Sequence, residues 1–371
     1  MNLHTMQVPF YDIQAQYKDL ATEIDAVVHD VISTGNYVLG SHNKAFEEEF
    51  ARLHQVKHAI AVHSGTDALR IMMDAAGIGR GDEVITTAFT FVASVETIVQ
   101  TGATPVFVDV DLNTFMMDPE KIEAAITSKT KAILPIHLFG QLYDVARIGS
   151  IAEKHGLTVL EDAAQAIEST YNGKPAGHFG VSAGFSFYVT KNLGAAGDGG
   201  MITTNDDETN EKCRSIRVHG MGRERYYYDH LGYTARLDEI QAAVLRVKMT
   251  KLSDWGARKV EIANKYIADL SGIEGLQLPI TSEGNNHTYH QFTVKSKNRD
   301  ALQSHLKDLG VPSMIYYPVP IHHHTPYLQF APASPLSVTE QISKEVLSLP
   351  IHPHLSDEQV QHVVDSIKKF F

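Results

Sequence analysis

The stretch FYVTKNLGAAGDGGMITT, residues 187–204, places one lysine, Lys191, in a run of small residues and glycines. The glycines after the lysine let the backbone bend and approach another group closely. The apolar residues on both sides, AGFSFY before and GMITT after, predict two strands that this turn joins. Because a buried lysine without a partner is costly, we expect another group to face Lys191 or to be attached to it.

The composition limits the classes of protein. The chain has 371 residues, enough for one large domain with a smaller one. Its net charge of −12 argues against general binding to nucleic acid or to an anionic membrane. No apolar run approaches the roughly 18 residues of a membrane span, and the N-terminus lacks the pattern of a secretory signal. The single cysteine, Cys213, excludes an intrachain disulfide and fits a reducing cytoplasm, where we expect the protein to work.

Short apolar runs alternate with helical patterns over the first 250 residues. The predicted strands are 58–64, 82–94, 104–111, 131–139 and 157–163. After the first of them, Leu69, Met72, Met73 and Ala76 follow helical spacing, and 147–156 is another predicted helix. This alternation predicts an α/β fold, a mostly parallel sheet with helices on both faces. Ligands of such sheets usually lie beyond the carboxyl ends of the strands.

The second part of the chain has a different pattern. Residues 235–255 predict one long helix, and 287–317 predict a strand, a helix and a second strand. The last helix begins with a capping box at Ser356 and Gln359. We therefore expect a large domain over 1–250 and a small α+β domain over 251–371. We expect the amphipathic helix at 22–32 to pack on the second domain or on a partner subunit.

Three groups of polar residues fall at the ends of predicted strands. Ser64, Gly65 and Thr66 precede a helix, whose free N–H groups suit a phosphate, although a hydroxyl there more often only caps the helix. Asp162 ends a buried strand, where an acid usually caps a helix or forms a salt bridge but can also pair with a protonated ring nitrogen. Lys191, if desolvated, is a nucleophile toward carbonyl groups.

Together, in this order, the three groups are what pyridoxal 5′-phosphate (PLP) requires: a phosphate anchor, a carboxylate for the ring nitrogen and an amine for the aldehyde. The sequence resembles the nucleotide-sugar aminotransferases of the DegT/StrS family. The resemblance is carried by SGTDAL, GDEVITTAFTFVAS, GATPVFVDVD, EDAAQA, FSFYVTKNLGAAGDGGMITTND, RLDEIQAAVL and YYPVPIH. It implies the PLP-transferase fold of the aspartate-aminotransferase type, a three-layer α/β/α large domain with a smaller C-terminal domain.

The resemblance also implies roles for single residues. Lys191 would hold the cofactor aldehyde as a Schiff base, and Asp162 would face the pyridine nitrogen. Gln165 would bond the ring hydroxyl, and Phe91 would stack on the ring.

Three further residues, Gly65, Thr66 and Ser186, would hold the cofactor phosphate. The family commonly has an asparagine that reaches the phosphate of the neighbouring subunit, and here that position is Thr234, whose hydroxyl can donate one hydrogen bond. Because the active site of the family lies between two subunits, the resemblance implies a homodimer.

The lysine also indicates the type of reaction. Family members that dehydrate their sugar have histidine in its place, so Lys191 favours amino transfer, with L-glutamate as the expected donor. The pattern FYVTKNLGAAGDGG resembles the subgroup that aminates carbon 3 of a nucleotide-linked ketosugar, in the biosynthesis of amino sugars for surface polysaccharide, lipopolysaccharide or glycosylated products. The residues leave the choice between dTDP and UDP open. Tyr188 and His322 are candidates for sugar contacts, and Tyr188 has core packing as its alternative.

Three other functions are alternatives to this one: amination at carbon 4, a PLP-binding regulatory protein without turnover, and a nicotinamide-dependent oxidoreductase. The sequence lacks the Gly-x-Gly-x-x-Gly turn after the first strand that a nicotinamide-dependent oxidoreductase would need. The histidines of 321–327 and 351–354 could indicate a metal site. There is no His-Glu-x-x-His motif, no cysteine cluster and no carboxylate at the usual spacing, so we expect no catalytic metal.

Overall fold

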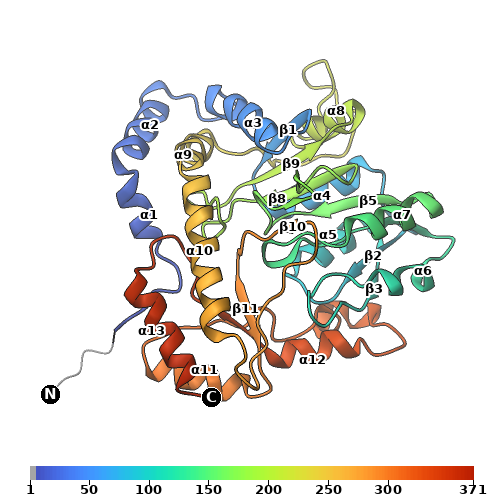
Figure 1. Cartoon of the computed structure of the whole chain (residues 1–371). Helices are drawn as coiled ribbons and strands as arrows, with labels where there is room; N and C mark the ends of the chain where they lie inside the picture. The colour runs from blue at the N-terminus through green and yellow to red at the C-terminus, as the bar shows by residue number, and fades with distance from the viewer. Residues whose placement is uncertain (1–5) are drawn as a thin grey trace.

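A seven-stranded sheet lies at the centre of the computed structural model, which describes residues 6–371 (Figure 1). Across the sheet the strands are β1 (His58–Val62), β9 (Gly200–Thr204), β8 (Ser182–Ser186), β5 (Thr158–Asp162), β4 (Thr130–Ile133), β2 (Glu83–Thr87) and β3 (Thr104–Val108). β9 is antiparallel to both of its neighbours, and the pairs from β8 to β3 are parallel. The α/β fold with a mostly parallel sheet is confirmed.

Helices cover both faces of this sheet because alternate strand residues point to opposite sides. Ile60 and Val62 of β1 pack in one cluster with α4, whereas Ala59 and Ala61 pack in another with α3. The first face carries α4 (Gly65–Ala75), α5 (Ala93–Gln100) and α8 (Asp207–Ile216). The opposite face carries α3 (Ser41–Leu53), α6 (Ile122–Ala125), α7 (Val145–His155) and α9 (Glu239–Met249).

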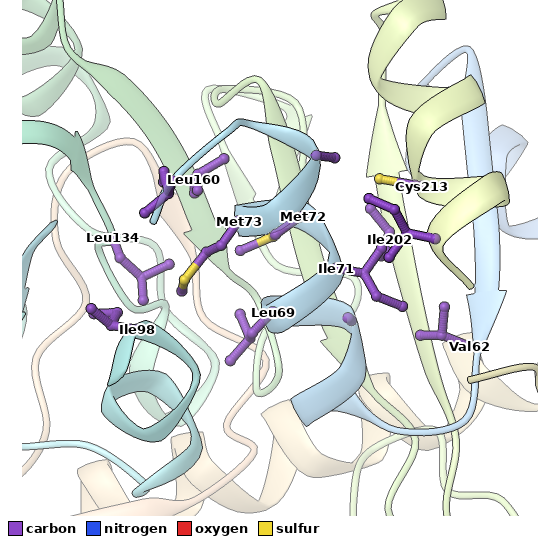
Figure 2. Packing of buried hydrophobic residues seen from close by; sticks show 14 of the residues in the cluster. Val62, Leu69, Ile71, Met72, Met73, Ile98, Leu134, Leu160, Ile202 and Cys213 are labelled. Carbon is purple, nitrogen blue, oxygen red and sulfur yellow. The ribbon is translucent and has the colours of Figure 1, made fainter. Parts of the chain in front are cut away.

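Figure 2 shows how α4 is buried over the sheet, with Met73 on the side of Leu134 and Ile71 on the side of Ile202. The apolar stripe predicted for this helix is buried as far as Met73. Ala76, its last predicted member, is exposed at the C-cap, because the helix ends at Ala75.

A second layer of structure packs around a two-stranded antiparallel sheet of β11 (Phe292–Lys295) and β12 (Val346–Leu349). Three helices bury their apolar faces against it: α10 (Leu252–Leu270), α11 (Arg299–Asp308) and α13 (Asp357–Lys368). α12 (Ser337–Glu345) leads into β12. The capping box predicted at Ser356 and Gln359 is present at the start of α13. Val8, near the start of the chain, belongs to this second core.

Three expected elements differ from the structure. The strand expected over 82–94 ends at Thr87, and α5 begins at Ala93. The single helix expected over 235–255 is two helices, α9 and α10, with a break at Thr250 and Lys251. The second strand expected before residue 317 is absent from the described residues; that segment forms one bridge, at Met314, and β12 pairs with β11 instead. The domain boundary expected at 250/251 coincides with the helix break and stays a prediction.

The N-terminal helices lie beside α9 and α10 (Figure 1). α2 (Ala21–Thr34) packs on α9 through Ile24 and Val244, next to Trp255 of α10. Its main contact in this chain is therefore with a helix of the sheet layer. The remaining short elements are α1 (Ile13–Asp19), β6 (Thr170–Tyr171), β7 (Lys174–Pro175), β10 (Asn285–Asn286), η1 (Pro119–Lys121), η2 (Leu138–Gly140), η3 (Ile321–His323) and η4 (Thr325–Phe330). Within residues 6–371, no helix has the length and apolar character needed to cross a membrane.

Candidate active site

The turn between β8 and β9 carries Lys191, and glycines let it fold closely on its surroundings. A Cβ on Gly194 would lie 2.4 Å from the carbonyl oxygen of Val189, within the same turn. A Cβ on Gly200 would lie 2.3 Å from the carbonyl oxygen of Ser64. Only glycine fits such approaches. The glycine-rich sequence therefore presses the turn against the start of α4, where the phosphate anchor was expected.

Lys191 lies in this turn with a half-buried side chain. Its Nζ forms no hydrogen bond or ion pair with residues 6–371, and its nearest charge of note is Asp162. Burial lowers the pKa of Lys191 from 10.5 to about 8, although the attraction of Asp162 acts in the opposite direction. At pH 7.5 about a quarter of such amines are neutral, far more than for a solvated lysine. The residue thus has the protonation behaviour of a nucleophile.

Asp162 is buried at the end of β5, and two donors hold its carboxylate. Ser94 Oγ donates to Oδ2 at 2.6 Å, and the Ala164 N–H donates to Oδ1 at 3.1 Å. Burial raises the pKa of Asp162, whereas both hydrogen bonds and the charge of Lys191 lower it. A desolvated carboxylate of this kind binds a cationic N–H more strongly than a carboxylate in water does.

The start of α4 offers an anion site and a helix cap at the same time. Ser64 caps the helix, since its Oγ accepts the N–H of Asp67 at 3.0 Å. The first-turn N–H groups, including those of Gly65 and Thr66, have no partner within the helix and suit a phosphate. A Cβ on Gly65 would lie 2.7 Å from Ser186 Cβ, so these two residues form one tight surface. The helix-cap interpretation of this stretch is confirmed, and the phosphate interpretation stays a prediction.

Phe91 and Gln165 lie on the same side of the sheet as the Lys191 turn and are linked through Tyr317. Phe91 is 55% exposed, and its ring centroid lies 6.4 Å from that of Tyr317. Gln165 accepts the Phe139 N–H at 2.8 Å and donates to Tyr317 Oη at 3.1 Å. An exposed aromatic ring beside polar groups is what a flat cofactor ring requires.

Three other expected site residues are placed differently. Tyr188 is 50% exposed next to the lysine turn, so the core-packing alternative is wrong for it; the packing residue is its neighbour Phe187. Thr234 is exposed and bonds His219 Nε2 at 2.9 Å, and its expected role toward a second subunit stays a prediction. His322 is buried against Phe107 of the edge strand β3, close to Glu340. The structure does not bring His322 to the group around Lys191.

Several residues of this site were missed from the sequence. Ser94 and Tyr317 contact the expected site residues Asp162 and Gln165 directly. Behind the turn, Lys259 of α10 donates to Asn192 Oδ1 at 2.7 Å and so holds the residue next to Lys191. Burial lowers the pKa of Lys259 to about 7. No signal in the sequence distinguishes these residues from others on their helices and loops.

The chain is similar along nearly its whole length to proteins of one aminotransferase family. The profile of the DegT/DnrJ/EryC1/StrS aminotransferase family matches residues 18–368. A "pleiotropic regulatory protein" of Geobacillus stearothermophilus is 47% identical, covering 99% of both chains. A dTDP-3-amino-3,4,6-trideoxy-alpha-D-glucose transaminase of Streptomyces venezuelae is 41% identical over 99% of this chain and 97% of its own. A UDP-N-acetyl-3-dehydro-alpha-D-glucosamine 3-aminotransferase of Acidithiobacillus ferrooxidans is 42% identical over 98% and 97%.

Solved structures agree with these sequence matches. S. venezuelae DesV, crystallised with a ketimine intermediate, superposes with a TM-score of 0.96 at 41% identity, covering 99% of each chain. The Bacillus subtilis protein NtdA, crystallised with the cofactor PMP, gives a TM-score of 0.93 at 32% identity, covering 99% of this chain and 86% of its own.

Proposed function

The chain belongs to the DegT/DnrJ/EryC1/StrS aminotransferase family, and we propose that it moves an amino group from L-glutamate to the 3-keto carbon of a nucleotide-linked sugar. It is a PLP-dependent transaminase, as its family and its solved relatives are. The observation that carries the proposal is the desolvated amine of Lys191 opposite the buried carboxylate of Asp162. The relatives that act on nucleotide-linked sugars, under both dTDP and UDP names, support the substrate class.

The residues around Lys191 fit the cofactor. Gly65, Thr66 and Ser186 would hold its phosphate, since Gly65 packs closely on Ser186 at the start of α4, where the first N–H groups of the helix suit an anion. Phe91 would cover its ring, and Gln165 would bond the ring hydroxyl. When bound, the cofactor withdraws electrons from the bond to be broken and carries the amino group between the two substrates.

Two side chains would handle protons. Asp162 would keep the ring nitrogen protonated, because Ser94 and the Ala164 N–H stabilise its charged form. Lys191 Nζ would take the proton from the Cα of the amino donor and, in the second half of the reaction, give a proton to the sugar carbon that receives the amino group. With a pKa of about 8, its amine can both accept and release a proton near neutral pH.

We also propose a homodimer with a shared active site. Large apolar side chains are exposed in two segments: Tyr37, Val38 and Leu39, and the loop that ends before Thr234, where Leu231 is 87% exposed. Exposed apolar groups of this kind support contact with a second copy. A dimer predicts twice the mass of one chain in sedimentation.

The buried, unpaired thiol of Cys213 supports a location in the cytoplasm.

The test is to incubate the holoenzyme with L-glutamate and, separately, 3-keto and 4-keto nucleotide sugars carrying dTDP or UDP. The expected result is formation of 2-oxoglutarate and an amine at carbon 3, located by NMR. An amine at carbon 4 would refute the regiochemistry.

The regulatory alternative is the one that the name of the G. stearothermophilus relative describes. It predicts that the chain binds PLP but forms no 2-oxoglutarate with any of these sugars.

Borohydride reduction should fix the cofactor to the peptide that contains Lys191, and Lys191→Ala should remove both the label and turnover. A label on another peptide would overturn the assignment.

A further inference from the structure

Two histidines and one glutamate meet near the edge strand β3, away from the Lys191 turn. His322 and His323 lie in η3, and Glu340 lies in α12. One ligand atom from each of the three lies within 4.8 Å of the other two. Neither the sheet nor the proposed reaction uses these side chains.

The glutamate and the two histidines of this cluster are too far apart to bond one another directly. Glu340 Oε1 lies 3.9 Å from His322 Nε2 and 3.7 Å from His323 Nε2, too far for a hydrogen bond. Other histidine–carboxylate pairs, such as His137–Glu161 at 2.8 Å and His354–Asp19 at 2.7 Å, lie at hydrogen-bond distance, although the pair His42–Asp30 is also open at 3.9 Å. The three groups therefore face one another without satisfying one another.

His322 is the buried member of this cluster. Its side chain is 4% exposed, and its Nδ1 is buried without a partner. Among residues 6–371, neither nitrogen of this ring forms a hydrogen bond, although a buried polar group left unpaired is costly. Glu340 likewise accepts no side-chain hydrogen bond from those residues. A bound ion would satisfy the Glu340 carboxylate and His322 Nε2, the ring nitrogen that faces it, while Nδ1 points away from this space.

Both segments that carry the ligands are anchored to the sheet edge. The Ile321 N–H donates to the Ala88 carbonyl at 3.0 Å, after β2. The start of α12 is held by Asp109, whose carboxylate accepts the N–H groups of Val338 and Thr339 at 2.9 and 2.8 Å. Ligands on anchored elements give up little freedom when an ion binds.

We propose that His322, His323 and Glu340 form a Zn²⁺ site. Two imidazoles and a carboxylate suit zinc, whereas Mg²⁺ and Ca²⁺ prefer oxygen ligands alone. Tetrahedral zinc with bonds of about 2.0–2.1 Å holds its ligand atoms about 3.4 Å apart. Glu340 Oε1 therefore needs to approach each histidine nitrogen by only a few tenths of an ångström, and the two histidine nitrogens lie within 4.8 Å of each other. His323 is 46% exposed, which leaves the fourth position open to water.

The expectation of no metal rested on spacing along the sequence. Glu340 is far from the histidines in sequence, and α12 brings it to them. Consecutive histidines usually point apart, but in η3 the two ring centroids lie 4.1 Å apart. Zinc at this position joins α12 to the segment that follows Tyr317, the residue bonded to Gln165.

The experiment measures zinc binding by the untagged, PLP-loaded enzyme, stripped of metals with a chelator and titrated with ZnCl₂ against a chromophoric competitor. One ion per chain with micromolar affinity is expected, and Co²⁺ in its place should give the visible absorption of a four-coordinate site. His323→Ala and Glu340→Gln should each weaken binding at least tenfold. Both residues are partly exposed, so the fold should survive.

His324→Ala is the matched control, since this exposed histidine is in the same tract but outside the cluster. It should bind zinc like the unchanged enzyme. Zinc should also raise the melting temperature of the unchanged enzyme and not that of Glu340→Gln. Equal binding by the unchanged enzyme and Glu340→Gln would overturn the proposal, because the ion would then lie elsewhere, for example at His352 and His354. No binding at 100 µM zinc would overturn it as well.

Discussion

Lys259 is the buried cation whose replacement gives the sharpest test of the structure. It lies behind the Lys191 turn, 6% exposed, and its Nζ bonds Asn192 Oδ1 at 2.7 Å. Burial lowers its pKa from 10.5 to about 7. Because a lowered lysine pKa means that the unfolded chain binds the proton more tightly, the charge costs about 5 kcal/mol of stability below pH 7 and nothing above about pH 10.5. Between these limits stability rises by about 1.4 kcal/mol per pH unit.

Lys259→Met removes this cost but leaves Asn192 Oδ1 without its donor, a loss of about 1–3 kcal/mol. At pH 6 the variant should therefore be about 2–4 kcal/mol more stable than the unchanged protein. Near pH 10.5 it should be about 1–3 kcal/mol less stable, with the sign changing near pH 9. We therefore expect Lys259→Met to raise the free energy of unfolding at neutral pH and to lower kcat.

The assay is urea unfolding of both proteins without cofactor, at one protein concentration and from pH 6 to 10. Unfolding is followed by the fluorescence of Trp255, the single tryptophan, which lies in α10 one turn before Lys259. Lys265→Met on the same helix, where Lys265 bonds Asp269 near the surface, is the matched control and should show no such trend. A stability difference for Lys259→Met that changes by less than about 1 kcal/mol over this range would refute the desolvation argument.

The same variant tests whether Lys259 positions the lysine turn. Loss of the bond to Asn192 should lower kcat about tenfold at pH 8, the effect of one hydrogen bond, with little change in the KM for glutamate. Asn192→Ala removes the bond from the other side and should give the same loss, and the double variant should lose no more. Additive losses would mean that the two residues act separately.

Three further variants test the cofactor site. Asp162→Asn should still bind PLP but lose at least 100-fold in kcat, because a neutral amide cannot keep the ring nitrogen protonated; a loss below tenfold would contradict its role. Ser94→Ala removes the hydrogen bond that lowers the pKa of Asp162, so the loss in kcat should be about tenfold at neutral pH and should grow as the pH falls, which a pH–rate profile would show. Gly65→Ala places a Cβ 2.7 Å from Ser186 Cβ and should weaken PLP affinity at least tenfold in equilibrium dialysis. The melting temperature of the cofactor-free protein should fall as well, because Ser186 must shift to make room.

The fold could be predicted largely from the sequence because both faces of the sheet are buried. Apolar runs such as 157–163 mark strands of this kind, and β5 occupies Thr158–Asp162. The break between α9 and α10 could not be predicted, since no glycine or proline interrupts 235–255 and the apolar spacing runs through it. The partner of β11 could not be predicted either, because β12 begins about fifty residues later and pairing over that distance leaves no local signal.

The candidate site divides in the same way. Lys191 and Asp162 stand out in the sequence because a charged residue in or after an apolar strand is rare. Ser94, Tyr317 and Lys259 do not, since a hydroxyl or a lysine on a helix or loop is ordinary until the chain folds. They reach the site only because the sheet order and the position of α10 bring three distant segments together.

The pair Glu161–Asp162 shows how far elementary geometry reaches. Neighbouring strand residues point to opposite faces, so only one of two adjacent acids can face the site. Strand alternation alone does not say which one; the resemblance to the family selected Asp162. In the structure Glu161 accepts hydrogen bonds from His137 and from the N–H groups of Gly177, Phe179 and Gly180, and these hold its pKa low despite burial. The oxygens of the Glu161 carboxylate are therefore already bonded by donors within the protein. Asp162 has two donors and faces Lys191, so it is the carboxylate with capacity left for a ligand.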